Sequence, residues 1–309
     1  MAYRNSLPEY VETTHFFRSG EEVLFGILST PRSSSQNEVA VVLIPGGSQG
    51  PSSGRNQMTA RLARRLAAMG LTTFRFDFHG IGEATGTVDR FRLDRPFVED
   101  TTAALAYLTD HGINRFLLVG GCFGARTALA CSRERTDIEG LVLQALPVRD
   151  KEKDATGITR VAPDRTVWQY ARRGVRPHVV RNMFRRRHRR AYVHLFREAW
   201  RSRGSSENVE PSWMSASLVA DVADVVARSI PTLIVNGTQD PGYLDFEHAL
   251  EEELGELFGR PEADVELTTL EGRVGAAADA TLHEPVMDVI GRWLARRQLT
   301  PSAVPVQSK

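Results

Sequence analysis

The stretch Leu117-Leu118-Val119-Gly120-Gly121-Cys122-Phe123-Gly124-Ala125-Arg126 decides how this 309-residue chain folds. An apolar run typical of a buried strand ends in the pentapeptide G-x-C-x-G and passes directly into sequence compatible with a helix. A residue at the tip of such a tight turn has strained backbone, and the residues two before and two after it must be small. Gly120 and Gly124 meet that need. The pattern predicts that Cys122 stands at the tip of a strand-to-helix turn.

That position has chemical consequences for Cys122. The unpaired N–H groups and the dipole at a helix N-terminus favour an anion, and the thiolate is the reactive form of cysteine. The alternative is a buried cysteine that ends a core strand beside an incidental pair of glycines. Cys122 is therefore a candidate nucleophile.

Composition indicates an ordinary globular protein, with 41% hydrophobic and 25% charged residues and a formal net charge of +1. That charge predicts no bulk attraction to nucleic acid. Two cysteines, Cys122 and Cys131, make no disulfide framework and suit a reducing cytosol. No apolar leader or membrane-spanning run is present, so we expect a cytoplasmic protein. No histidine spacing suggests a metal site, and no cofactor is expected.

The rest of the chain alternates between strand and helix patterns. Two strands are expected in 11–31, and further strands at 39–44, 72–78, 116–121, 138–146, 230–235 and 265–270. Helices are expected at 58–68, 98–110, after Cys122, at 246–258 and at 285–297. Nearly unbroken apolar strands that alternate with helices predict an α/β fold with a mostly parallel sheet flanked by helices.

The alternation stops after Pro147 and resumes near Ile230. Between them the sequence shows only helical and loop character, which predicts a helical lid inserted into the sheet. The expected organisation is a core of 1–148 and 229–297, a lid of 149–228 and a flexible tail of 298–309.

The lid carries a strong local charge. Residues 172–203 contain 12 arginines and one acid, Glu198, a local net charge of +11. This run predicts docking of an acidic carrier protein or of the phosphates of coenzyme A. The alternative is a solvated helix face that balances an acidic body. No nucleic-acid-binding module surrounds the run.

Acyl chemistry at this turn would need hydrogen-bond donors for an oxyanion and an acid to orient a base. The expected donors are the backbone N–H groups of Phe123, which follows the cysteine, and of Gly47 in the turn after strand 39–44. Asp240 is the expected acid because it follows the strand that resumes the sheet after the lid. Asp150 is a weaker candidate for the same role.

The base is harder to place. A histidine is expected just after the last strand, in residues 271–275, and none stands there. His283, about eight residues later, is the first candidate, and a helix-start residue is the alternative reading. His79, in the loop after strand 72–78, is the second candidate.

Several motifs together resemble the α/β-hydrolase superfamily: Pro45-Gly46-Gly47, Arg75-Phe76-Asp77-Phe78-His79-Gly80-Ile81-Gly82, Gly120-Gly121-Cys122-Phe123-Gly124 and Gly237-Thr238-Gln239-Asp240. More closely, the chain is similar to the cysteine-elbow hydrolases associated with exosortase systems. It departs from their pattern at His79, where arginine is common, and at Ala84, where serine is common. Cysteine-elbow relatives also include shuttles that move thioester-bound acyl and aminoacyl groups between carrier proteins.

The resemblance implies an α/β-hydrolase fold and an acyl-transfer enzyme, an acyltransferase or thioesterase. Thioester exchange onto a thiol is nearly isoenergetic, whereas an ester or amide offers a thiolate a much poorer leaving group. Cys122 therefore favours an acyl thioester over an ester as substrate. The alternatives are a carboxylesterase and a binding protein whose catalytic residues have decayed.

Overall fold

The computed structural model describes residues 9–32, 39–47, 51–88, 91–133, 135–150, 152–153, 159–160, 214–275 and 280–297. The chain divides into two compact units, one of residues 1–158 and 214–309 and one of residues 159–213. Within the second unit only the short strand β9 (Thr159–Arg160) is described. The arginine-rich run 172–203 and the tail 298–309 lie outside the described residues.

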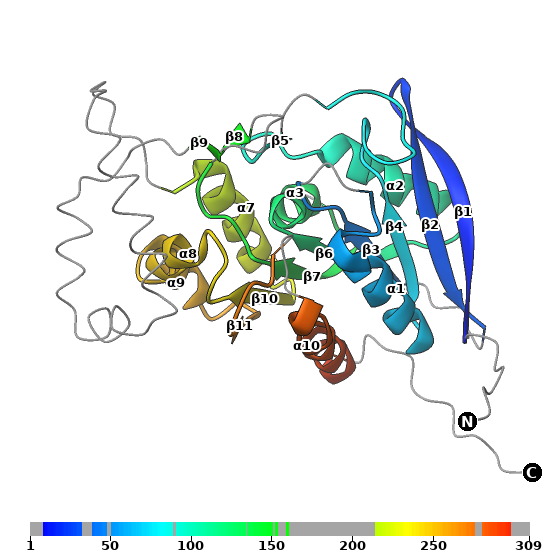
Figure 1. The fold of residues 1–309 in the computed structure, drawn as a ribbon. Coiled ribbons are helices and arrows are strands. Elements are labelled where there is room, and N and C mark those ends of the chain that lie inside the picture. The colour runs from blue at the N-terminus through cyan, green and yellow to red at the C-terminus, as the bar shows by residue number, and fades with distance from the viewer. Residues whose placement is uncertain are drawn as a thin grey trace, which may run out of the picture. The chain divides into compact units, whose positions relative to one another are not determined.

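The first unit is built on an eight-stranded sheet (Figure 1). Its order is β1-β2-β4-β3-β6-β7-β10-β11. The strands are β1 (Tyr10–Ser19), β2 (Glu22–Pro31), β3 (Val39–Ile44), β4 (Thr72–Phe76), β6 (Arg115–Gly121), β7 (Ile138–Gln144), β10 (Thr232–Gly237) and β11 (Val265–Leu270). The last six strands of that order pair in parallel, and the β1–β2 hairpin adds to β4 in antiparallel fashion. The expected fold class is confirmed.

Helices cover both faces of this sheet (Figure 1). On one face lie α1 (Met58–Ala68) and α10 (His283–Arg296), and on the other lie α2 (Val98–Asp110), α3 (Phe123–Ser132) and α7 (Ala216–Ala227). The remaining elements are η1 (Arg55–Gln57), β5 (Phe91–Arg92), β8 (Glu152–Lys153), α8 (Tyr243–Leu250), α9 (Glu253–Phe258) and η2 (Ala280–Leu282). No helix in the described part of the chain is long and apolar enough to cross a bilayer.

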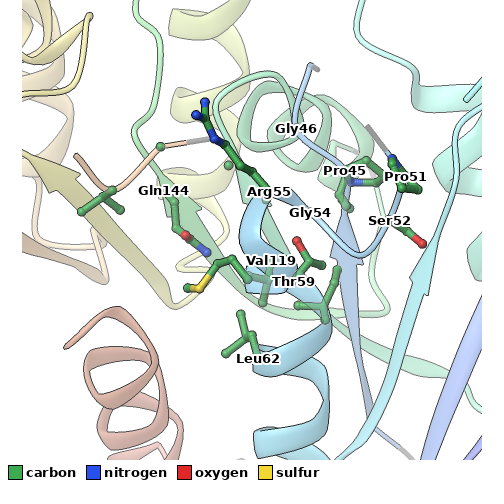
Figure 2. A pocket seen from close by; sticks show the side chains of 17 residues that line it. Pro45, Gly46, Pro51, Ser52, Gly54, Arg55, Thr59, Leu62, Val119 and Gln144 are labelled. Atoms are coloured by element: carbon green, nitrogen blue, oxygen red, sulfur yellow. The ribbon is translucent and has the colours of Figure 1, made fainter. Parts of the chain in front are cut away.

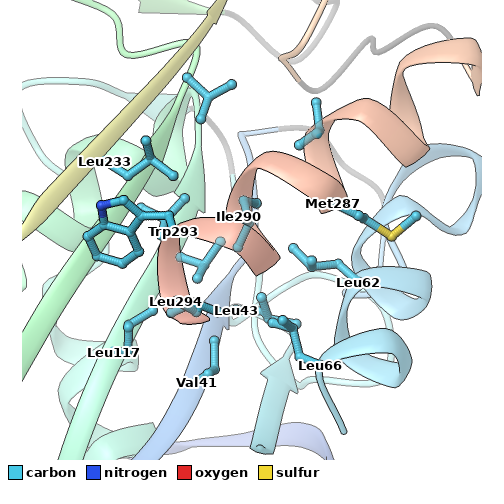
Figure 3. Close-up of a cluster of buried hydrophobic side chains, with 14 of the residues drawn as sticks. Val41, Leu43, Leu62, Leu66, Leu117, Leu233, Met287, Ile290, Trp293 and Leu294 are labelled. Carbon is cyan, nitrogen blue, oxygen red and sulfur yellow. The ribbon is translucent and has the colours of Figure 1, made fainter. Parts of the chain in front are cut away.

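The main core fills the space between α1, α10 and the central strands (Figure 3). Trp293 and Ile290 of α10 are fully buried there, against Val41 of β3 and Leu117 of β6. Burying side chains of this size stabilises a fold by about 1.5–3 kcal/mol each. The central parallel strands are therefore packed firmly against α1 and α10.

One buried arginine joins the two points at which the chain leaves and re-enters the core. Arg126, on α3, is 1% exposed, and its Nη2 lies 3.1 Å from Oδ1 of Asp150, 2.8 Å from Oγ of Ser215 and 2.9 Å from Oγ of Ser217. The backbone N–H of Ser215 also donates to the carbonyl oxygen of Val148 at 2.9 Å. Residues 150 and 214 are thus held close together, as an insertion into a sheet requires.

Three features differ from the expectations. The helix expected at 246–258 is two helices, α8 and α9, because Glu252 has φ −126° and ψ −130° and interrupts it. The region expected to hold no strand contains β8 and β9. Helix α7, expected within the lid, packs against α3 in the first unit.

Candidate active site

Cys122 occupies the strained turn between β6 and α3. Its φ of 53° and ψ of −110° lie where non-glycine residues rarely sit, and such backbone costs of order 1–3 kcal/mol. The Cys122 N–H donates to the carbonyl oxygen of Gln144 at 2.8 Å, and the Cys122 carbonyl oxygen accepts from the N–H of Ala125 at 3.1 Å. The side chain is half-buried, in contrast with the buried Cys131. These two hydrogen bonds hold the strained backbone of Cys122 at the N-terminus of α3.

The two glycines of the pentapeptide permit this turn. A Cβ on Gly120 would stand 2.2 Å from the carbonyl oxygen of Gly124, and a Cβ on Gly124 would stand 2.6 Å from that of Pro45. Neither position has room for a side chain. The expectation that both must be small is confirmed.

Gly47 and Phe123 meet beside the cysteine. A Cβ on Gly47 would lie 2.6 Å from Cβ of Phe123, so the turn after β3 packs closely on the first residue of α3. No described side chain caps this helix, and the N–H groups of its first two residues, Phe123 and Gly124, have no intrahelical acceptor. The two segments expected to supply oxyanion donors are therefore neighbours.

Aromatic rings hold the first turn of α3. The Phe123 ring centroid is 5.0 Å from that of Phe97, 5.1 Å from that of Phe91 and 6.0 Å from that of Phe78. Phe123 itself is 2% exposed. This packing fills the space on one side of the strand-to-helix turn formed by residues 120–124, which we call the elbow.

Asp240 lies at the carboxyl end of β10, where an acid was expected. Its Oδ2 accepts the N–H of Gly237 at 2.7 Å, and its Oδ1 accepts the N–H groups of Val274 and Gly275, both at 3.0 Å. Burial raises the pKa of the Asp240 carboxyl, and the three N–H bonds act in the opposite direction. Asp240 thus joins β10 to the segment after β11, the segment in which a histidine was expected and is absent.

His283 is the first residue of α10 and is 1% exposed. The adjacent Glu284 forms ion pairs with Arg61 and Arg65 of α1, so this turn belongs to the layer between the two helices. The cavity next to Gly120 and Gly121, described below, is lined by neither His283, His79 nor Cys122 itself. Asp150, the weaker acid candidate, pairs with Arg126 instead.

His79 follows β4 and is held by a carboxylate that the sequence did not single out. Its Nδ1 lies 2.7 Å from Oδ2 of Asp100, and the same oxygen accepts the His79 N–H at 2.9 Å. The other oxygen of Asp100 accepts the hydroxyl of Ser19 at 2.7 Å. Asp100 is 4% exposed, whereas about a third of the His79 side chain is exposed. This is an oriented histidine–carboxylate pair on the rim that also carries Cys122.

A cavity of about 80 Å³ opens beside the elbow (Figure 2). Its walls include Gly120 and Gly121, which precede the cysteine, and Pro45 and Gly46, which precede Gly47. Ser52 also lines it, and its N–H is held by the buried carboxylate of Asp77 at the end of β4. The cavity therefore borders both the turn at Cys122 and the turn after β3.

A parallel sheet covered by helices, with a strained residue between a central strand and its helix, defines the α/β-hydrolase architecture. The alpha/beta hydrolase family model matches residues 41–285, and the chain belongs to that family. No curated protein matches this chain in sequence.

Solved structures with the same fold cover nearly the whole chain. Proline iminopeptidase of Mycobacterium smegmatis is 16% identical with a TM-score of 0.55, and the match covers 93% of this chain and 99% of that one. An esterase of Pyrococcus furiosus is 14% identical with a TM-score of 0.58, covering 94% and 96%. The esterase domain of a Rhodothermus marinus protein is 17% identical with a TM-score of 0.55, covering 93% and 99%. At these identities the likeness establishes the fold.

Proposed function

We propose that this protein transfers acyl groups through Cys122, with an acyl thioester as donor. The observation that carries the proposal is the position of Cys122. Its backbone is strained at φ 53° and ψ −110°, its side chain is half-buried, and it stands directly before the N-terminus of α3. Sγ of Cys122 attacks the thioester carbonyl, a new C–S bond forms, and the donor sulfur leaves as a thiolate. The N–H groups of Phe123 and Gly47 stabilise the tetrahedral oxyanion.

The second step releases the acyl group. An acceptor amine, alcohol, thiol or water attacks the acyl-cysteine, gives up its proton to a base, and Cys122 leaves as a thiolate. A thioester donor needs no proton on its leaving group at neutral pH, so the base is required chiefly for the acceptor.

His79 is better supported as that base than His283. The buried Asp100 at Nδ1 favours the tautomer whose Nε2 accepts a proton. β4 and β6 are separated by β3, which puts their ends about 10 Å apart at ordinary strand spacing. Within the described residues no hydrogen bond joins His79 to Cys122, so His79 is proposed to act on an incoming acceptor and not directly on Sγ. The pair of Asp240 and His283 is the alternative, with Asp240 already accepting three backbone N–H bonds.

Intact-mass analysis after mixing with acyl thioesters tests the first step. We expect one acyl adduct in the wild type and in Cys131→Ala, the matched cysteine control, and none in Cys122→Ala. A wild-type protein without an adduct or turnover would indicate a binding protein. Rapid turnover of nitrophenyl esters without preference for thioesters would indicate a carboxylesterase.

The decay of the preformed adduct identifies the base. His79→Gln and Asp100→Asn should slow this decay by about 10²-fold or more and leave adduct formation nearly unchanged. The same slowing in His283→Gln, with His79→Gln unaffected, would assign the role to His283.

A further inference from the structure

The cavity beside the elbow has an unusual polar lining. Arg55 of η1 is the sole charged residue among those that line it, and no carboxylate does (Figure 2). Two uncharged hydroxyl groups, those of Ser52 and Thr59, and the carboxamide of Gln144 complete its polar side chains. The net charge of the lining is therefore positive.

Gln144 extends from the end of β7 toward this cavity (Figure 2). It is 9% exposed, and its carboxamide has no hydrogen-bond partner among the described residues. The amide atoms of Gln144 are not among the buried unpartnered polar atoms of the described residues, so solvent reaches them and they are available to hydrogen-bond with a molecule in the cavity. Arg55 is exposed, and within the same described part of the chain its guanidinium forms no ion pair or hydrogen bond, so it is open to solvent at the edge of the cavity.

The position of the cavity suits the acyl chain of a bound thioester. With its carbonyl carbon at Cys122 and its oxygen toward Phe123 and Gly47, the chain would run either toward the rings around Phe123 or toward the cavity. Those rings fill the first of these directions. The cavity, bordered by Gly121 and Gly46, is the second.

Size and charge then define the group that fits. The volume of about 80 Å³ is only a few times the roughly 10–15 Å³ that a cavity needs to hold one water, so the site suits a short acyl group. A carboxylate at the edge of the cavity can pair with the Arg55 guanidinium, and the Gln144 carboxamide can donate a hydrogen bond elsewhere on the acyl group. We propose that this cavity selects short acyl groups that end in a carboxylate, so that the donor is the monothioester of a short dicarboxylic acid. This inference rests on the proposed role of Cys122.

The test compares two thioesters of N-acetylcysteamine that match in length, succinyl and butyryl, at limiting concentration. The rate of adduct formation is followed by intact mass. We expect succinyl transfer to be faster by about tenfold or more, the usual effect of a charge-assisted hydrogen bond. Arg55→Gln and the near-isosteric Gln144→Met should bring the ratio toward one. Arg61→Gln, an exposed arginine on the same segment that pairs with Glu284, should keep the wild-type ratio.

A binding measurement separates this inference from the proposed function. Calorimetry on Cys122→Ala compares two unreactive amides, succinamate and butyramide. If Cys122→Ala binds succinamate selectively and Arg55→Gln abolishes that binding, the carboxylate site is supported. This holds even if no thioester acylates the wild type, a result that would overturn only the catalytic role of Cys122. Equal acylation by both thioesters overturns the carboxylate site and leaves the catalytic role standing. Absence of both binding and acylation overturns both.

Discussion

The backbone N–H of Cys122 donates a 2.8 Å hydrogen bond to the carbonyl oxygen of Gln144, and the side chain of that same Gln144 lines the adjacent cavity. The strained turn and the cavity wall are therefore parts of one rigid connection between the ends of β6 and β7. A shift of either strand would displace the thiol and the carboxamide together.

The two cysteines should react very differently with alkylating agents. Cys122 is half-exposed, whereas Cys131 is 2% exposed and burial raises the pKa of its thiol. Because the thiolate is the reactive form, iodoacetamide should add once to the native protein and twice in denaturant. Intact mass and peptide mapping provide the measurement. A native adduct on Cys131, or one that persists in Cys122→Ala, would contradict the structure.

Alanine at either glycine of the elbow should destabilise the fold. The added Cβ in Gly120→Ala or Gly124→Ala would meet backbone atoms less than 3 Å away, and we expect a loss of about 1–3 kcal/mol in unfolding free energy. The neighbouring Gly121→Ala is the control, because its Cβ would have ordinary contacts with Gln144 at 3.8 Å. Urea denaturation checks this. Equal midpoints for Gly121→Ala and Gly124→Ala would show that the turn has more room than described.

Replacing Asp240 by alanine should cost stability whether or not Asp240 takes part in catalysis. The change removes the acceptor of three N–H groups, and we expect a loss of roughly 2–3 kcal/mol. Thermal denaturation provides the measurement, with the exposed Asp110→Ala as control. Activity must be measured at a temperature at which both variants are folded. A melting temperature equal to that of the control would mean that these bonds contribute little.

His15 should make the protein less stable in mild acid. Burial, together with the nearby His111, lowers the pKa of His15 below its ordinary 6.5, so the unfolded chain takes up this proton first. The stability that His15 contributes is complete above that value and is lost as the pH falls through the lowered pKa. His15→Gln, which keeps a polar group near the Tyr107 hydroxyl, should flatten the pH dependence of the urea midpoint between about pH 8 and 5. An unchanged slope in the variant would rule out His15 as the source.

Local sequence signals predicted most of the elements. β3, α2 and β11 have the predicted boundaries because continuous apolar runs or helical periodicity define each of them. The break between α8 and α9 escaped prediction, since Glu251 and Glu252 are good helix formers and only their observed backbone angles reveal the interruption.

The site was less predictable than the fold. Cys122 and its glycines form a local pattern, so their geometry followed from spacing alone. Asp100 was missed because an acid in the first turn of a helix is ordinary, and its contact with His79 spans 21 residues. The cavity was missed because it depends on Arg55 and Gln144, which come together only through the order of the strands.

Arg126 makes the core independent of the segment that lies between residues 150 and 215. Its guanidinium links Asp150, where the chain departs, to Ser215, where it returns, one helical turn from Cys122. The two halves of the core are neighbours in space whatever sequence lies between them. Evolution, or a protein engineer, can therefore exchange that intervening segment for another without rebuilding the strand-to-helix turn at Cys122.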